Sequence, residues 1–181
     1  LQGIKRGIEK ESLRVDKSGK LASTCHPIAL GSSLTHPFIT TDYSEALLEF
    51  ITPPLSNLNG IFDVLDELHQ YTYHVLKEEE LLWVASMPCY LPCEEEIPVA
   101  KYGRSNLGML KHIYRRGLGY RYGRAMQMIA GVHYNFSLPK DFWEKYKILL
   151  GSKQVEKDFI SEQYLAISRN VLRFGWILPL L

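Results

Sequence analysis

Two glutamates one residue apart constrain what this chain can fold into. Glu9 and Glu11 lie in the strand-like run 7–15, and residues i and i+2 of a strand point to the same face. Two carboxylates on one face repel each other unless a cation lies between them. A divalent metal such as Mg²⁺ is one solution, because it takes oxygen ligands. The other is a solvated outer face, since Lys10 lies between the two acids.

Composition places the chain among ordinary globular proteins. Its 181 residues are 46% hydrophobic and 23% charged, which suffices for one good core. The net charge of +1 gives no overall electrostatic attraction to nucleic acid or to an acidic lipid surface. No apolar run is long enough to span a bilayer, and no signal peptide is recognisable. Three sparse cysteines argue against a zinc site and suit free thiols in a reducing cytoplasm.

The pattern of elements predicts a single α+β domain over residues 1–181. Strand-like segments cover residues 3–15, 38–52 and 126–138, the second ending at Pro53 and Pro54. Helical periodicity follows Ser56 or Asn57, and further helices are expected at about 105–120, 139–150 and 153–174. In the helix after Ser105 the residues expected to face inward are Leu107, Leu110, Ile113 and Leu118. The chain opens without Met and closes on apolar residues, so we expect a fragment of a longer protein.

A second acidic group lies in segment 41–50. If residues 45–51 form a strand, Glu45 and Glu49 share a face with Leu47 and Ile51. Charges among apolar side chains are costly to bury unless they are paired or bound to a metal. Glu49 is therefore expected to have a cationic partner, which is either a metal or an Arg or Lys side chain.

A strand over 132–137 carries polar and apolar side chains on opposite faces. His133, Asn135 and Ser137 share one face, which suits a lined cavity, and Val132, Tyr134 and Phe136 form a reverse face that we expect to be buried. His133 is a candidate metal ligand or a hydrogen-bond donor to phosphate. A purely structural hydrogen bond is the alternative.

Segment 114–124 contains four arginines, three tyrosines and three glycines. Such a mixture is typical of a basic aromatic patch for nucleic acid, but the near-neutral chain disfavours that reading. The arginines could equally bind a carboxylate or phosphate of a small substrate through paired hydrogen bonds. The sequence has no P-loop, no Rossmann glycine fingerprint, no zinc-protease HExxH motif and no GxSxG motif.

Several stretches together resemble the amino-terminal part of bacterial glutamate–cysteine ligase of the γ-proteobacterial type. They read GIEKESLR (7–14), FITTDYSEALLEFITP (38–53), SMPCY (86–90), YGRSN (102–106), GVHYNFSLP (131–139) and RFGW (173–176). These stretches keep the family order and run nearly from end to end, whereas 91–98 departs from the pattern. The resemblance implies a partial glutamine synthetase-like catalytic domain, in which a curved, largely antiparallel sheet is flanked by helices.

The resemblance also implies an activity. ATP phosphorylates the γ-carboxylate of L-glutamate, and the amine of L-cysteine then displaces phosphate to give γ-glutamylcysteine, the first step of glutathione biosynthesis. Phosphoryl transfer needs positive charge around the phosphate oxygens, which Mg²⁺ or Mn²⁺ supplies. The implied partners are therefore ATP, glutamate and cysteine, with no nucleic acid and no membrane, in the cytoplasm.

The residues carried over from the family fall into two sets. The implied metal ligands are Glu9, Glu11, Asp42, Glu49 and His133, with further acidic ligands expected beyond this chain. The implied substrate-binding residues are Tyr43, Tyr114, Leu118 and Gln127 around cysteine and Arg115 for a substrate carboxylate. The alternative is a catalytically inactive metal-binding fragment of the same fold, and we expect the isolated chain to be inactive.

Overall fold

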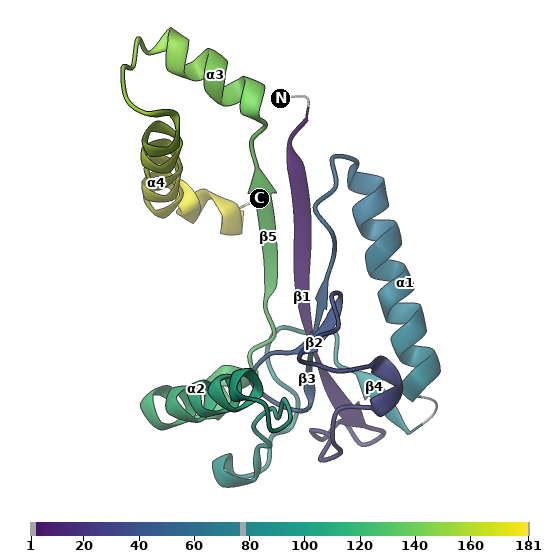
Figure 1. The fold of residues 1–181 in the computed structure, drawn as a ribbon. Helices are drawn as coiled ribbons and strands as arrows, with labels where there is room; N and C mark the ends of the chain where they lie inside the picture. Colours follow the sequence, from purple (N-terminus) through teal and green to yellow (C-terminus); the bar gives the residue numbers. More distant parts are fainter. Residues whose placement is uncertain (1–2, 77–78, 181) are drawn as a thin grey trace. The chain divides into compact units, whose positions relative to one another are not determined.

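An open sheet is built around strand β1 (Lys5–Asp16). β3 (Leu47–Ile51) pairs antiparallel with the middle of β1, and β2 (Ile39–Thr41) pairs antiparallel with β3. β4 (Glu80–Leu82) pairs antiparallel with the end of β1, and β5 (Val132–Ser137) also pairs with β1. The described strands follow the order β2-β3-β1-β4 with β5 off this path (Figure 1). This arrangement confirms the predicted α+β class and its largely antiparallel sheet.

The computed structural model describes residues 3–76 and 79–180. The chain divides into two compact units, of which the larger comprises Lys5–Phe136 and contains nearly the whole sheet. The smaller comprises the residues from Ser137 onward together with Gly3 and Ile4. That residues 1–181 act as one domain stays a prediction. In the described part of the chain, no helix is long and apolar enough to cross a membrane.

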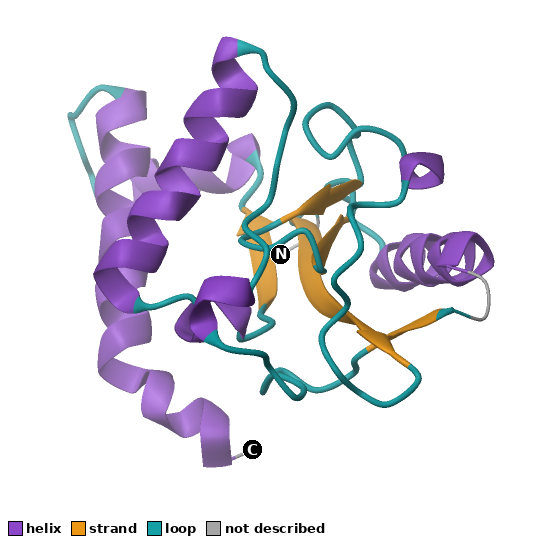
Figure 2. Ribbon diagram, turned by 90° about the horizontal axis from the view of Figure 1, so that it is seen from below, coloured by secondary structure: helices purple, strands orange, loops and turns teal. Residues whose placement is uncertain are grey.

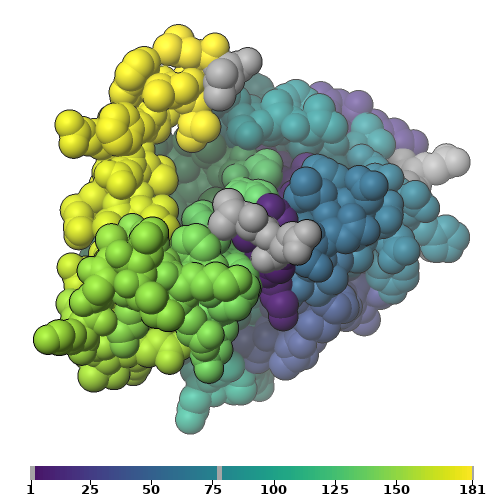
Figure 3. All heavy atoms as spheres, turned by 90° about the horizontal axis from the view of Figure 1, so that it is seen from above, coloured from purple at the N-terminus to yellow at the C-terminus, as the bar shows by residue number. Residues whose placement is uncertain are grey.

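Helix α1 (Leu58–Leu76) covers one face of the sheet, as the helical periodicity predicts. Asn57 begins it, because its side-chain oxygen accepts a hydrogen bond from the backbone N–H of Asn59 at 3.1 Å. The inner side of α1 packs on a core that lies against β2, β3 and β4, with Leu48 and Phe50 at its centre. Its opposite flank is open to solvent (Figure 3), where Phe62 is exposed.

Helix α2 (Asn106–Tyr122) begins as expected, since Ser105 Oγ accepts from the N–H of Gly108 at 3.1 Å. The prediction of its inward face is wrong for Leu107, Leu110 and Ile113, which are all exposed. The reason is that only the carboxyl-terminal end of α2 reaches the other hydrophobic core of the larger unit. There Leu118 packs against the cluster that surrounds Leu13, Leu47, Tyr43 and Met128.

The segment 38–52, predicted as one strand, consists of β2, a turn and β3. Figure 2 shows the strands of the sheet joined by loops and turns. Glu45 lies in the turn, and its carboxylate accepts hydrogen bonds from the backbone N–H groups of His26 and Lys101. Nearby, the fully buried Arg14 pairs with Glu80 on β4 at 2.5 Å. Glu45 therefore holds two loop segments together, and the Arg14–Glu80 pair joins β1 to β4.

β5 also differs from its prediction. All six of its residues are exposed, including Val132, Tyr134 and Phe136 on the face expected to be buried. A short 3₁₀ helix (Ala125–Met128) precedes β5, so the strand begins later than the sequence pattern indicates.

The smaller unit is a helical hairpin. Its helices are α3 (Lys140–Leu149) and α4 (Glu156–Phe174), and a 3₁₀ turn (Gly175–Leu180) follows. Aromatic rings join the two helices, with Trp143 packed 4.9 Å from Tyr164 between ring centroids. The hydroxyl of Tyr164 also accepts the backbone N–H of Leu138 at 3.0 Å, which ties α4 to the segment that leads into α3.

Candidate metal centre and substrate site

Three ligand-type side chains meet where β1, β3 and β5 come together. Glu9, Glu49 and His133 each offer one atom, and these atoms all lie within 4.8 Å of one another. The strands hold them there because β1 lies between its two neighbours: Glu9 is on β1, Glu49 is on β3 and His133 is on β5. Three of the five predicted metal ligands are thus brought together.

Glu9 is held from the side of β5. Its Oε1 accepts a hydrogen bond from Asn135 Nδ2 at 2.8 Å, and its Oε2 lies 3.4 Å from His133 Nδ1. The strand pattern predicts Asn135 on the same face as His133, but nothing in the sequence indicates a role for it in the site. Its contact with Glu9 orients that carboxylate towards the imidazole.

Glu11 and Glu49 are direct partners across the β1–β3 ladder. Like charges at directly opposite positions destabilise a sheet. Burial, together with the charges of Asp42, Glu11 and Glu9, raises the pKa of Glu49 to about 7. Burial also raises the pKa of Glu11, although the backbone N–H of Gly131, which donates to Glu11 Oε2 at 2.7 Å, counteracts it.

Asp42 borders the three-residue cluster without belonging to it. Its charge contributes to the raised pKa of both Glu11 and Glu49, so its carboxylate acts on the same site. Arg115 on α2 lies next to it, with one terminal nitrogen 3.7 Å from Asp42 Oδ1. The Nε–H group of Arg115 donates to the main-chain carbonyl of Asp42. Arg115, predicted to take a substrate carboxylate, is thus placed beside the acidic cluster.

The other predicted substrate-binding residues gather around α2. Tyr43 is buried against the helix, and its hydroxyl has no hydrogen-bond partner among the described residues. Leu118 packs on the same core, Gln127 lies partly buried in the 3₁₀ helix that follows α2, and Tyr114 is exposed. The structure therefore brings Tyr43 and Leu118 into one core and leaves Tyr114 on the surface.

The donors fit a hard divalent cation. Two carboxylates and an imidazole from three strands provide oxygen and nitrogen ligands of the kind that Mg²⁺ and Mn²⁺ accept. The ion pairs formed among residues 3–76 and 79–180 give Glu49 no Lys or Arg partner.

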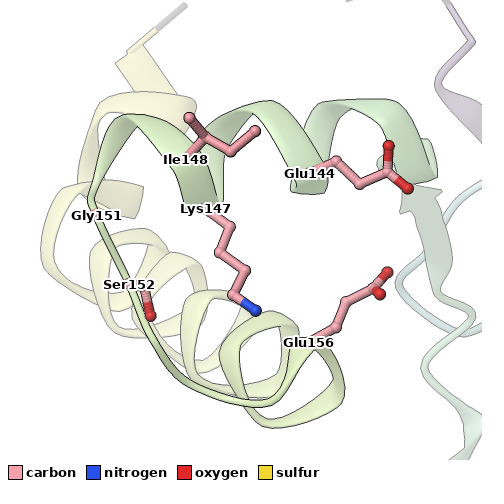
Figure 4. Close-up of a pocket in the computed structure, with 6 residues that line it drawn as sticks. All are labelled: Glu144, Lys147, Ile148, Gly151, Ser152 and Glu156. Atoms are coloured by element: carbon pink, nitrogen blue, oxygen red, sulfur yellow. The ribbon is translucent and has the colours of Figure 1, made fainter.

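A separate hollow lies between α3 and α4 in the smaller unit (Figure 4). Glu144 and Glu156 extend from the two helices on either side of it, and Lys147 reaches into the space between them. None of the predicted site residues lines this hollow.

Comparison with known proteins decides the family. The family model of glutamate–cysteine ligase matches residues 1–181. This chain belongs to the glutamate–cysteine ligase family. The glutamate–cysteine ligase of Alcanivorax borkumensis is 55% identical over 178 residues, which cover 98% of this chain and 34% of that protein. That of Pseudomonas entomophila is 55% identical and covers 95% of this chain and 32% of the relative.

Two solved structures share the fold of this chain. The glutamate–cysteine ligase of Francisella tularensis in complex with AMP has a TM-score of 0.90 and 38% identity, covering 99% of this chain and 34% of that one. A bifunctional glutathione synthetase from Pasteurella multocida has a TM-score of 0.88 and 38% identity, covering 98% and 23%. The resemblance drawn from the sequence is confirmed, and the chain spans about a third of the length of the ligases it matches.

Proposed function

We propose that this chain carries the metal-binding part, and part of the amino-acid site, of an ATP-dependent glutamate–cysteine ligase. The observation that carries the proposal is the meeting of Glu9, Glu49 and His133 from three strands, with no Lys or Arg paired to Glu49 in the described residues. Membership of the ligase family supports the reaction, and the AMP bound to the Francisella tularensis relative supports ATP as the nucleotide.

The reaction joins two amino acids through an activated carboxylate. The γ-carboxylate oxygen of glutamate attacks the γ-phosphorus of ATP, which gives γ-glutamyl phosphate and ADP. The amine of cysteine then attacks the acyl carbon, and phosphate leaves as the amide bond forms. The product is γ-glutamylcysteine, made in the cytoplasm as the first step towards glutathione.

The proposed roles follow the geometry. Glu9, Glu49 and His133, with Glu11 and Asp42 beside them, would hold Mg²⁺ or Mn²⁺. When bound, such an ion offsets the negative charge of the phosphate oxygens.

The amino-acid pocket is assigned to the neighbouring helix. Arg115 lies where its guanidinium can exchange Asp42 for a substrate carboxylate. Tyr114, Leu118, Gln127 and Tyr43 are assigned to the surroundings of cysteine. Tyr43 is buried in this chain, so it would shape the pocket through the residues that cover it.

A chimeric enzyme tests the proposal. This chain replaces the matching 178 residues of the Alcanivorax borkumensis ligase, and phosphate release is measured with ATP, glutamate, cysteine and Mg²⁺. We expect turnover, and we expect Glu9→Gln to reduce it by about 100-fold or more, because a bound metal contributes several kcal/mol to transition-state stabilisation. Glu67→Gln on the exposed side of α1 is the matched control. An active Glu9→Gln chimera would refute the ligand role.

The isolated chain is expected to be inactive, because it offers too few ligands to hold ATP securely. Robust phosphate release by the 181-residue chain alone would overturn that expectation. If a well-folded chimera binds Mn²⁺ but shows no turnover, the alternative of an inactive metal-binding fragment is favoured.

A further inference from the structure

Tyr102 is buried beside the turn that leads from β2 to β3. Its side chain is 5% exposed, and its hydroxyl lies 2.7 Å from the carbonyl oxygen of Thr41 and 3.0 Å from that of Asp42. The hydroxyl also accepts a hydrogen bond from Thr41 Oγ1 at 3.2 Å. Burial raises the pKa of Tyr102 to about 12, so the hydroxyl keeps its proton and remains a donor near neutral pH.

Two cationic side chains of α2 lie over the ring of Tyr102. The guanidinium carbon of Arg115 lies 4.8 Å from the ring centroid, and the ammonium of Lys111 lies 5.3 Å from it. Contacts of this kind are favourable, the more so where the cation is shielded from water. Arg115 then reaches the main-chain carbonyl of Asp42, the same oxygen that the hydroxyl of Tyr102 contacts.

Asp42 depends on these contacts for its direction. Its side chain is 43% exposed, so packing alone does not hold the carboxylate. Thr40 pairs with Glu49 in the β2–β3 ladder, and the backbone N–H of Asp42 donates to the carbonyl of Leu47 at 3.0 Å. Asp42 therefore continues the line of β2 two residues beyond Thr40, on the sheet face that carries Glu49. The ladder holds the N–H of residue 42, and the Tyr102 hydroxyl and the Arg115 guanidinium hold its carbonyl oxygen.

We propose that Tyr102 is a positioning residue for the metal centre: it fixes the carbonyl groups of Thr41 and Asp42 and carries Arg115, and so aims the Asp42 carboxylate at the cluster of Glu9, Glu49 and His133. The proposal rests on the proposed metal site. Tyr102 itself touches neither metal nor substrate, because its hydroxyl is occupied by main-chain oxygens.

Tyr102→Phe tests the contribution of the hydroxyl separately from that of the ring. The ring stays under Arg115, and only the oxygen that fixes Thr41 and Asp42 is lost. We expect Mn²⁺ binding to the 181-residue chain, followed by the electron paramagnetic resonance signal of free Mn²⁺, to weaken about tenfold, as is typical when a partner of a metal ligand is removed. Tyr71→Phe is the matched control, because it also removes a hydroxyl that donates to a main-chain carbonyl, that of Ala29 at 2.7 Å. Its affinity should equal that of the wild type.

A double-mutant cycle distinguishes positioning from general loosening. If Tyr102 acts through Asp42, adding Tyr102→Phe to Asp42→Asn lowers the Mn²⁺ affinity no further. An equal loss in both backgrounds, or no loss in the wild-type background, overturns the inference while the metal site stands. A wild-type chain that binds no Mn²⁺ removes the metal site and this inference with it.

Thermal unfolding of each variant shows which samples are folded during the titration. If Tyr102→Phe does not fold, Thr41→Val removes only the hydroxyl that donates to Tyr102. This variant is expected to weaken Mn²⁺ binding by about threefold, the equivalent of one hydrogen bond. Unchanged affinity in Thr41→Val would then count against the inference.

Discussion

Glu49→Gln is expected to stabilise the folded chain at alkaline pH. The wild-type carboxylate faces Glu11 across the β1–β3 ladder, and burial with three neighbouring carboxylates raises its pKa from 4.5 to about 7. The substitution keeps the shape of the side chain and removes the charge. Because Glu49 forms no ion pair among the described residues, no salt bridge is lost with it.

The magnitude follows from that pKa difference. Each pKa unit corresponds to about 1.36 kcal/mol, so the whole difference is worth ~3 kcal/mol. Solvent screening of the half-buried Glu49 side chain reduces this to about 1–2 kcal/mol. Since folding raises the pKa, the contribution of Glu49 to stability is fully present below pH 4.5 and is lost as the pH rises through about 7. Glu49→Gln has no carboxylate to ionise at this position, so its free energy of unfolding does not fall in this way as the pH rises.

Urea unfolding of both proteins in EDTA, at pH 8, 6.5 and 5, measures the effect. The free energy of unfolding of Glu49→Gln should exceed that of the wild type by about 1–2 kcal/mol at pH 8, and most of this excess should disappear by pH 5. Added Mg²⁺ should stabilise the wild type more than the variant. Glu67→Gln, on the exposed side of α1, should show no such pH dependence. A variant less stable than the wild type at pH 8, or an excess that grows towards pH 5, would refute the reasoning.

Two further predictions concern the framework around the site. Glu80→Ala should lower the free energy of unfolding by about 3–5 kcal/mol in urea titrations, because it leaves the buried Arg14 guanidinium without its carboxylate. Gly119→Ala should destabilise the fold by about 1–3 kcal/mol, since its Cβ would clash with the hydroxyl of Tyr43. Gly117→Ala in the same helix meets no atom within 4 Å and should instead stabilise by about 1 kcal/mol, and a loss there equal to that of Gly119→Ala would contradict the steric argument.

Local signals in the sequence predicted most of the elements. The starts of α1 and α2 follow from Asn57 and Ser105, which cap the helices through contacts within a few residues. The division of 38–52 into two strands was missed because the turn 42–46 contains neither Gly nor Pro. The outward direction of Leu107 could not be predicted either, since periodicity identifies an apolar face and not what covers it.

The sequence predicted only part of the site, because local patterns do not show which distant segments pair. The alternation of residues placed Glu9 and Glu11 on one strand face, and the resemblance to a family supplied the other ligands. What brings them together is pairing between strands far apart in the sequence, such as the register that sets Glu11 opposite Glu49. Tyr102 was not predicted at all, because its contacts with Thr41 and Asp42 join residues about 60 positions apart. The ligand roles themselves stay predictions until metal binding is measured.

Because all six residues of β5 are exposed, assembly of the centre is separable from folding of the rest of the sheet. Among the described strands β5 pairs with β1, and none of its six residues is buried. Segments with few buried contacts open locally at a lower free energy than the whole fold. Such opening would carry His133 and Asn135 away from Glu9 while the β1–β3 ladder stays closed. A contact that strengthens the pairing of β5 with β1, such as a cation bound between Glu9 and His133, would thus also raise the fraction of molecules competent to bind.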